Sequence, residues 1–232
     1  MRYLGGKGRL AKQIACVILS STPRRDFYLE PFLGGANTFE HISPYFARPH
    51  AGDIHEDLML MWTAVASGWL PPDQLSQDQY EQLRSAPPSA LRAFAGFFCS
   101  FAGAWFAKYA RNERGTNYAG ESYRGIVRVA PAMRRSIVAR SSYHQWTPGD
   151  GWVVYADPPY AKTAGYRDAA SGFDHDYFWS TMDRWVNDGA HVYVSEFSAP
   201  PHWTCFGEVA RPSAQKESQR QSCERLFTRT SR

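Results

Sequence analysis

Residues 152–160 read Trp-Val-Val-Tyr-Ala-Asp-Pro-Pro-Tyr, the order expected of a strand that ends at a polar turn. The apolar run predicts a buried strand, and the proline pair predicts a rigid turn after it. Neither proline can donate a backbone N–H, so the carbonyl groups before them remain free acceptors. With the carboxylate of Asp157 and the ring of Tyr160, they would form a pocket for the amino group of an extruded nucleic-acid base. The alternative is an ordinary loop in which Asp157 is a turn residue.

A second segment has the order of a strand, a glycine turn and a helix. Residues 27–35 read Phe-Tyr-Leu-Glu-Pro-Phe-Leu-Gly-Gly. Asn37 and Glu40 have the spacing of a capping box at the start of the helix that would follow. Rossmann-like sheets use this layout to let a ligand approach the backbone, here at Gly34 and Gly35.

Two further segments fit a cofactor site. The next strand-like stretch ends at Asp53, 18 residues after Gly35, near the spacing at which an acidic residue meets a ribose. Residues 1–10 contain three glycines beside Lys7, which suits contact with an anionic or carboxylate-bearing ligand. The alternative for this segment is a loose basic terminus.

Taken together, these segments resemble the Dam-type DNA adenine methyltransferases, especially small phage-encoded members. Residues 3–7 match the family's aromatic-x-Gly-Gly-Lys motif, and residues 30–35 match its Glu-Pro-Phe-x-Gly-Gly motif. Asp53 matches the acidic residue after the second strand, and residues 157–160 match the catalytic Asp-Pro-Pro-Tyr. Residues 192–196 are similar to the strand that follows the catalytic motif, so the resemblance spans nearly the whole chain.

The resemblance implies an α/β fold: a Rossmann-like S-adenosylmethionine-dependent methyltransferase sheet with a mainly helical target-recognition insert. It divides the chain into a cofactor-binding half (1–65), the insert (66–146) and a catalytic half (147–232). One departure is Ala36, which stands where the family often has a third glycine. This difference bears on how the cofactor packs.

The implied reaction is site-specific methyl transfer from S-adenosylmethionine to the N6 amino group of adenine in DNA, with base flipping and without a metal. Asp157 would accept one amino N–H and the Pro158 carbonyl the other. The implied catalytic residues are Asp157, Pro158, Pro159 and Tyr160. The implied cofactor-binding residues are Tyr3, Gly6, Lys7, Glu30, Pro31, Phe32, Gly34, Gly35, Asp53, Ile54 and Asp157.

The insert is expected to contact the nucleic acid through residues 108–140. Six aromatic residues between 91 and 109 recur at helical spacing, which predicts a packed core for the insert. Residues 105–140 then carry eight basic and two acidic residues, a block suited to phosphate contacts, although a solvated face is the alternative. The predicted contacts to double-stranded DNA, bound by a monomer, are Lys108, Arg111, Asn112, Arg114, Arg124 and Arg128.

Composition narrows the class of protein. The chain has 232 residues, a net charge of +4 and 44% hydrophobic residues, enough for one α/β domain with an insert. It contains no run of 18 apolar residues and no secretory signal, so we expect no membrane contact and a location in the cytoplasm of a bacterial host cell. The cysteines are scattered, which predicts reduced core thiols; they are Cys16, Cys99, Cys205 and Cys223.

The remaining elements complete the expected sheet. A mobile loop over 162–173 would close over the flipped base, and a helix over 174–188 would follow with Asp174 as its cap. A strand is expected at 191–195 and a hairpin edge within 205–229.

Three other activities remain open from the sequence. Cytosine N4 methylation uses related chemistry, but such enzymes more often have serine in place of Asp157. Enzymes that modify RNA or protein glutamine more often have asparagine there. A degenerate relative that only binds DNA is the non-enzyme alternative. Transfer to cytosine carbon is disfavoured, because it typically uses a cysteine beside a proline and no Pro-Cys pair occurs.

Overall fold

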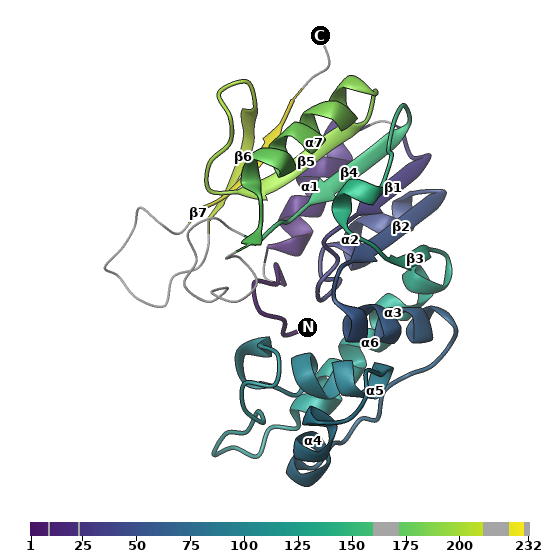
Figure 1. Cartoon of the computed structure of the whole chain (residues 1–232), viewed down its shortest axis with the longest axis vertical. Helices are drawn as coiled ribbons and strands as arrows, with labels where there is room; N and C mark the ends of the chain where they lie inside the picture. Colours follow the sequence, from purple (N-terminus) through teal and green to yellow (C-terminus); the bar gives the residue numbers. More distant parts are fainter. Residues whose placement is uncertain (9, 23, 160–171, 211–222, 230–232) are drawn as a thin grey trace.

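The computed structural model describes residues 1–8, 10–22, 24–159, 172–210 and 223–229. Over these residues the chain forms a seven-stranded sheet with helices on both faces and a group of helices at one end (Figure 1). The strands lie in the order β3-β2-β1-β4-β5-β7-β6. Their bounds are β1 Phe27–Glu30, β2 Arg48–Asp53, β3 Ile137–Arg140, β4 Trp152–Ala156, β5 His191–Glu196, β6 Thr204–Ala210 and β7 Cys223–Thr228.

The direction of the strands confirms the predicted Rossmann-like α/β fold. Strands β3, β2, β1, β4 and β5 are parallel, and β7 is antiparallel to β5 and β6. The β6–β7 pair is the predicted C-terminal hairpin edge. The chain moves outward from β1 to β2 and β3 and then returns to β4 on the other side of β1. Ligand sites in open α/β sheets form at the carboxyl ends of the strands at such a switch point.

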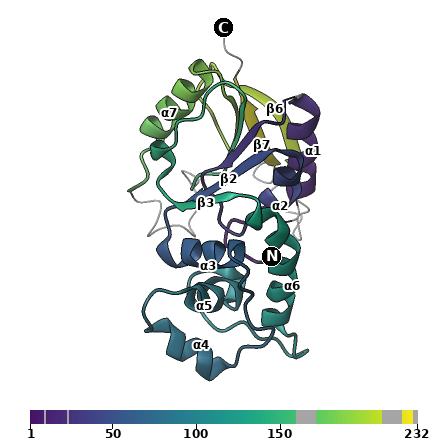
Figure 2. The ribbon, with the colours of Figure 1, turned by 90° about the vertical axis from the view of Figure 1, so that its right-hand side faces the viewer.

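Helices cover the two faces of the sheet (Figure 2). Helix α1, Ala11–Ser21, and the short α2, Phe39–Ile42, lie on one face, and α7, His175–Asn187, lies on the other. Because side chains alternate along a strand, Tyr28 packs in the core on the α1 face and Leu29 in the core under α7.

The helix predicted over 174–188 and its cap are confirmed. Asp174 caps α7 by accepting a hydrogen bond from the backbone N–H of Tyr177 at 2.8 Å. Buried apolar side chains join these helices to the core, and they are Leu10, Ile14 and Ile18 at α1 and Phe178, Met182, Trp185 and Val186 on α7.

A layer of helices lies against the end of the sheet (Figure 1). It contains α3 Glu56–Ala66, α4 Gln77–Arg84, α5 Ala90–Ala93, a π-helical turn Phe94–Phe98, a 3₁₀ turn Phe101–Gly103 and α6 Tyr118–Arg134. Two more 3₁₀ turns, Ser43–Tyr45 and Tyr143–Gln145, connect elements of the sheet. Strand β3 falls within the range 66–146, yet it pairs with β2 and extends the sheet.

The helical spacing of aromatic residues over 91–109 indicates a longer helix than the structure contains. The helical turns that begin at α5 end at Phe98. Ala102 and Phe106 then adopt left-handed backbone conformations, with φ of 55° and 41°, which do not fit an α-helix. The predicted core role is confirmed for Phe94, Phe97, Phe98 and Phe106, but Phe101 is 65% exposed.

The expectation of core thiols was wrong for two of the cysteines. Cys99 is buried, whereas Cys16 and Cys205 are free and exposed. Among the helices of the described ranges, none combines the length and the apolar character needed to cross a membrane.

Candidate active site

The candidate active site lies where β1 and β4 end, between the sheet and the helical layer. The N-terminal segment, residues 1–8, passes through this region (Figure 1). The backbone N–H of Leu4 donates to the carbonyl of Gly103 in the helical layer at 3.1 Å. Lys7 is directed instead toward the sheet. The segment thus connects the two layers at the switch point.

Lys7 and Asp157 form an ion pair at the end of β4. The Lys7 ammonium lies 2.6 Å from Oδ1 and 2.7 Å from Oδ2 of Asp157. Their side chains are 4% and 18% exposed, respectively. In such surroundings an ion pair is screened little by solvent. The pair joins two of the predicted site motifs, with buried Pro158 next to it; Tyr160 lies outside the described residues.

Glu30 is a second buried carboxyl group in the same region. It ends β1 and is 3% exposed. The hydroxyl of Tyr28 donates to its Oε2 at 3.2 Å. Burial raises the pKa of Glu30 well above its ordinary value, and the Tyr28 hydrogen bond offsets part of this rise. Buried Pro31 follows, and Phe32 stacks on Tyr143 with ring centroids 5.3 Å apart.

The two glycines of the β1 turn make room for Tyr3. A Cβ on Gly34 would lie 2.7 Å from Tyr3 Cε1, and one on Gly35 would lie 2.7 Å from Tyr3 Cβ. The ring of Tyr3 also contacts Phe97, with centroids 5.0 Å apart. We expected a ligand to approach the backbone here, but the close approach in this structure is made by Tyr3.

The predicted capping box at Asn37 was wrong. Helix α2 begins after Thr38, without a side-chain cap. The side chain of Asn37 is turned toward the N-terminus, and its Oδ1 accepts a hydrogen bond from the Met1 amine at 2.7 Å. Ala36 has a φ of 55°, so the position where the family often has glycine is one that favours glycine.

Asp53 joins the turn after β1 to the end of β2 by hydrogen bonds. Its Oδ2 accepts from the backbone N–H of Gly34 and its Oδ1 from that of His55, both at 3.0 Å. Burial raises the pKa of Asp53, and these two N–H groups offset part of the rise. The next residue, Ile54, is 71% exposed. An acidic group with an apolar neighbour at the end of β2 suits a nucleoside with a ribose and a ring.

The loop after β3 adds polar atoms that sequence reasoning missed. Ser141 Oγ and Trp146 Nε1 are buried and have no hydrogen-bond partner within the described ranges. A Cβ on Gly52 would lie 3.1 Å and 2.9 Å from them, so they lie beside the end of β2. The short run Ile137-Val138-Ala139 was the available signal for the strand that positions this loop.

The predicted DNA contacts lie on two parts of the helical layer. Lys108, Arg111 and Asn112 line a cavity of about 420 Å³ together with Phe101, Tyr109 and Glu113. Arg114 is exposed on the same loop, and Arg124 and Arg128 are exposed on α6. Asn112 is engaged within its own loop, since its Oδ1 accepts from the Thr116 backbone N–H at 3.0 Å. Arg128 pairs with Glu40 at 3.0 Å.

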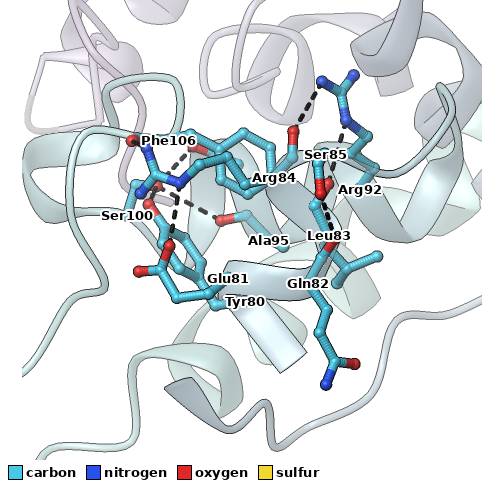
Figure 3. A network of polar contacts seen from close by, with 11 residues as sticks. Tyr80, Glu81, Gln82, Leu83, Arg84, Ser85, Arg92, Ala95, Ser100 and Phe106 are labelled. Atoms are coloured by element: carbon cyan, nitrogen blue, oxygen red, sulfur yellow. Dashed lines mark hydrogen bonds and ion pairs between the residues drawn. The ribbon is translucent and has the colours of Figure 1, made fainter. Parts of the chain in front are cut away.

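A network of hydrogen bonds joins α4 to the turns that precede this loop (Figure 3). The hydroxyl groups of Tyr80 and Ser100 lie 2.7 Å apart, and Arg84 donates to the carbonyl of Phe106 at 2.7 Å. Within the described residues, no group of three or more metal-ligating side chains is present.

Comparison with known proteins gives one match in sequence and several in fold. No family model matches the chain. A stretch of 68 residues, 29% of the chain, is 32% identical to the type II methyltransferase M.CviBI of Paramecium bursaria Chlorella virus NC1A. This chain spans about a quarter (25%) of that relative's length.

Solved structures align over nearly the whole chain at 12% identity. The rRNA methyltransferase aviRa of Streptomyces viridochromogenes has a TM-score of 0.47, with 98% of this chain and 86% of that one covered. The putative methyltransferase yhhF of Escherichia coli has a TM-score of 0.44, with 97% and 88% covered.

Proposed function

We propose that the chain is an S-adenosylmethionine-dependent methyltransferase that modifies the N6 amino group of adenine in double-stranded DNA. The observation that carries the proposal is the carboxylate of Asp157, bound by Lys7 at the switch point of a parallel sheet and followed by two prolines. The 68-residue similarity to a type II methyltransferase supports methyl transfer to DNA.

The chemistry of the site suits the proposed cofactor. Asp53 offers a carboxylate at the end of β2, and exposed Ile54 offers an apolar surface beside it. Ser141 Oγ and Trp146 Nε1 are donors without a described partner next to the same strand end, which suits the polar edge of a nucleoside. S-adenosylmethionine would supply a methyl group activated by a sulfonium centre. Tyr3, Gly6, Lys7, Glu30, Pro31, Phe32, Gly34 and Gly35 complete the proposed site.

Asp157 would activate the amino nitrogen of adenine. This nitrogen is a weak nucleophile because its lone pair is delocalised into the ring. Asp157 accepts one N–H and the Pro158 carbonyl accepts the other, which favours a tetrahedral nitrogen whose lone pair can attack in line. Bound S-adenosylmethionine would supply the methyl group to this lone pair and keep the electrons of the broken S–C bond on its sulfur, and the nitrogen would lose its extra proton to water. Tyr160 would stack on the flipped base.

Lys7 can remain in place during this step. It contacts both oxygens of Asp157, but each carboxylate oxygen has two lone pairs, so one oxygen can accept from Lys7 and from adenine together. Lys7 would fix the orientation of the Asp157 carboxylate. Catalysis of this kind depends on positioning the reacting groups.

Mass spectrometry of nucleosides from methylated DNA tests the proposal. Unmethylated DNA is incubated with the protein and S-adenosylmethionine and then digested. We expect N6-methyladenine. N4-methylcytosine would overturn the assignment of the base. Methylation of RNA or protein alone would overturn DNA as the substrate. The absence of both methyl transfer and cofactor binding would favour the degenerate relative that only binds DNA.

Residues 66–146 would recognise the target sequence, and the basic side chains of 108–140 would contact the DNA. Arg124 is exposed on α6, and no described carboxylate pairs with its guanidinium. We expect Arg124→Ala to weaken DNA binding several-fold and to lower the salt dependence of binding by about one phosphate contact. Arg128→Ala should have a smaller effect, because Glu40 already neutralises this side chain.

Fluorescence anisotropy with labelled duplex at several salt concentrations measures both variants. Arg24→Ala is the matched control, because Arg24 pairs with Asp26 and Asp150 near the start of β4, at the opposite end of the strand from Asp157. Unchanged DNA affinity in both α6 variants would contradict the proposed surface.

A further inference from the structure

The surface cavity of the helical layer contains a carboxylate that phosphate binding does not explain. Lys108, Arg111 and Glu113 line this cavity together with Asn112 and two aromatic rings. The three charged side chains are exposed, and among the described residues none of them has an ion-pair partner. Cations hold DNA phosphates, whereas a carboxylate among those cations is repelled by the phosphates. Glu113 therefore weakens this surface for DNA unless it meets a different group of the nucleic acid.

The backbone around Glu113 is held by a hydrogen-bonded turn. The Oδ1 of Asn112 accepts from the Thr116 backbone N–H at 3.0 Å, and its Nδ2 donates to Thr116 Oγ1 at 2.9 Å. The Gly115 N–H donates to the Asn112 carbonyl at 3.2 Å. These bonds close the chain across Glu113. A preformed turn presents its side chains to a ligand at a small cost in conformational entropy.

The charges of the cavity match the major-groove edge of a G·C base pair. Guanine presents two acceptors there, O6 and N7, and cytosine presents one donor, the N4 amino group. Arg111 offers paired donors and Glu113 offers acceptors, so together they suit both halves of the pair. Adenine is commonly read by an asparagine or glutamine amide. The amide of Asn112 is engaged by Thr116 at both its oxygen and its nitrogen, which favours a G·C pair over an A·T pair.

We propose that this cavity reads one G·C base pair of the target sequence, with Arg111 on guanine and Glu113 on cytosine. The inference rests on the proposed function, in which the chain acts on double-stranded DNA. Both side chains are then specificity-determining, and Lys108 remains a contact to phosphate.

Loss of the Glu113 carboxylate then has two effects of opposite sign. The preference for the G·C pair falls, because the N4 amino group of cytosine loses its acceptor. Affinity for unrelated DNA rises, because a charge that repels the phosphates is gone. A carboxylate that served only the solubility of the loop would give the second effect without the first.

The variants Glu113→Gln and Arg111→Ala test this assignment. Duplexes bound by each protein are selected from a random pool and sequenced, and methylated adenines are mapped in genomic DNA treated with the same proteins. Wild type should prefer G·C at one position by about tenfold or more, and both variants should reduce this preference to about twofold at the same position. Unrelated duplex should bind about twofold more tightly to Glu113→Gln and more weakly to Arg111→Ala.

Glu121→Gln is the matched control for the change of charge. Glu121 lies on α6, is half-exposed and pairs with Arg2 at 3.6 Å, and it does not line the cavity. Its variant should keep the sequence preference of wild type. A target without a required G·C pair, an unchanged preference in Glu113→Gln, or relaxation of different positions by the two variants would overturn the proposal. A G·C preference that both variants lose, without any N6-methyladenine from wild type, would instead overturn the proposed reaction and leave the reading of the base pair in place.

Discussion

Replacing Asp157 with alanine is expected to lower kcat by about 10³-fold while weakening cofactor binding much less. The variant loses the acceptor that would hold one N–H of the target amino group. It also leaves the Lys7 ammonium, 4% exposed, without the carboxylate that binds it through both oxygens. Single-turnover methylation measures the first effect, and titration calorimetry with S-adenosylmethionine measures cofactor binding.

A double variant separates catalysis from stability. Loss of one partner of a buried ion pair typically destabilises a protein by about 3–5 kcal/mol, and the partial exposure of Asp157, 18%, reduces this cost. Adding Lys7→Met to Asp157→Ala removes the buried ammonium that has lost this carboxylate, so Tm should recover while activity stays lost. Asp150→Ala, at the other end of β4, should keep full activity. A kcat for Asp157→Ala within tenfold of wild type would contradict the catalytic role.

Gly103→Ala is expected to have the largest effect on stability. Gly103 has a φ of 70°, and a Cβ there would lie 2.6 Å from Tyr3 Cα and 2.9 Å from the Leu4 nitrogen. These are backbone atoms, which cannot rotate out of the way. The N-terminal segment must move, and the Leu4–Gly103 hydrogen bond is lost. We expect a loss of about 2–3 kcal/mol in the free energy of unfolding, with activity falling as Lys7 is displaced.

Gly115→Ala is the matched control for this substitution. Gly115 has a similar φ of 64°, but no atom lies within 4 Å of the position that a Cβ would take. It therefore measures the cost of the backbone conformation alone, about 1 kcal/mol. Chemical denaturation of both variants gives the difference due to the close approach of the N-terminal segment. Equal losses of unfolding free energy in the two variants would show that the position of the N-terminal segment does not depend on Gly103.

Much of the sheet was predictable because its signals are local. The apolar run of β4, the glycine turn after β1 and the capped amphipathic helix α7 each depend on residues near one another in sequence. Strand β3 was missed because it is a short edge strand whose pairing with β2 is decided by tertiary contacts. The prediction that Asn37 caps a helix failed for the same reason, because its side chain makes a tertiary contact with the Met1 amine.

The sequence motifs pointed to individual residues of the candidate site, but they did not show how these residues are arranged. The motifs named Lys7 and Asp157, but nothing local shows that two side chains so far apart in sequence form an ion pair. A close approach at Gly34 and Gly35 was expected of a ligand, and spacing alone could not show that Tyr3 makes one there in this structure. Phe101 shares the periodicity of its buried neighbours and is exposed because the backbone leaves the helix before it.

The Lys7–Asp157 contact also has a consequence for how the chain folds. It closes a loop of 150 residues, and the chain entropy lost in closing a loop grows with its length. Contacts of such long range form slowly unless intervening structure has already brought their ends together. The pair therefore depends on β1 and β4 being paired beforehand. A chain that has folded only as far as β3 contains most of the cofactor motifs but no assembled centre, so activity should be gained late in refolding, with the last long-range contacts.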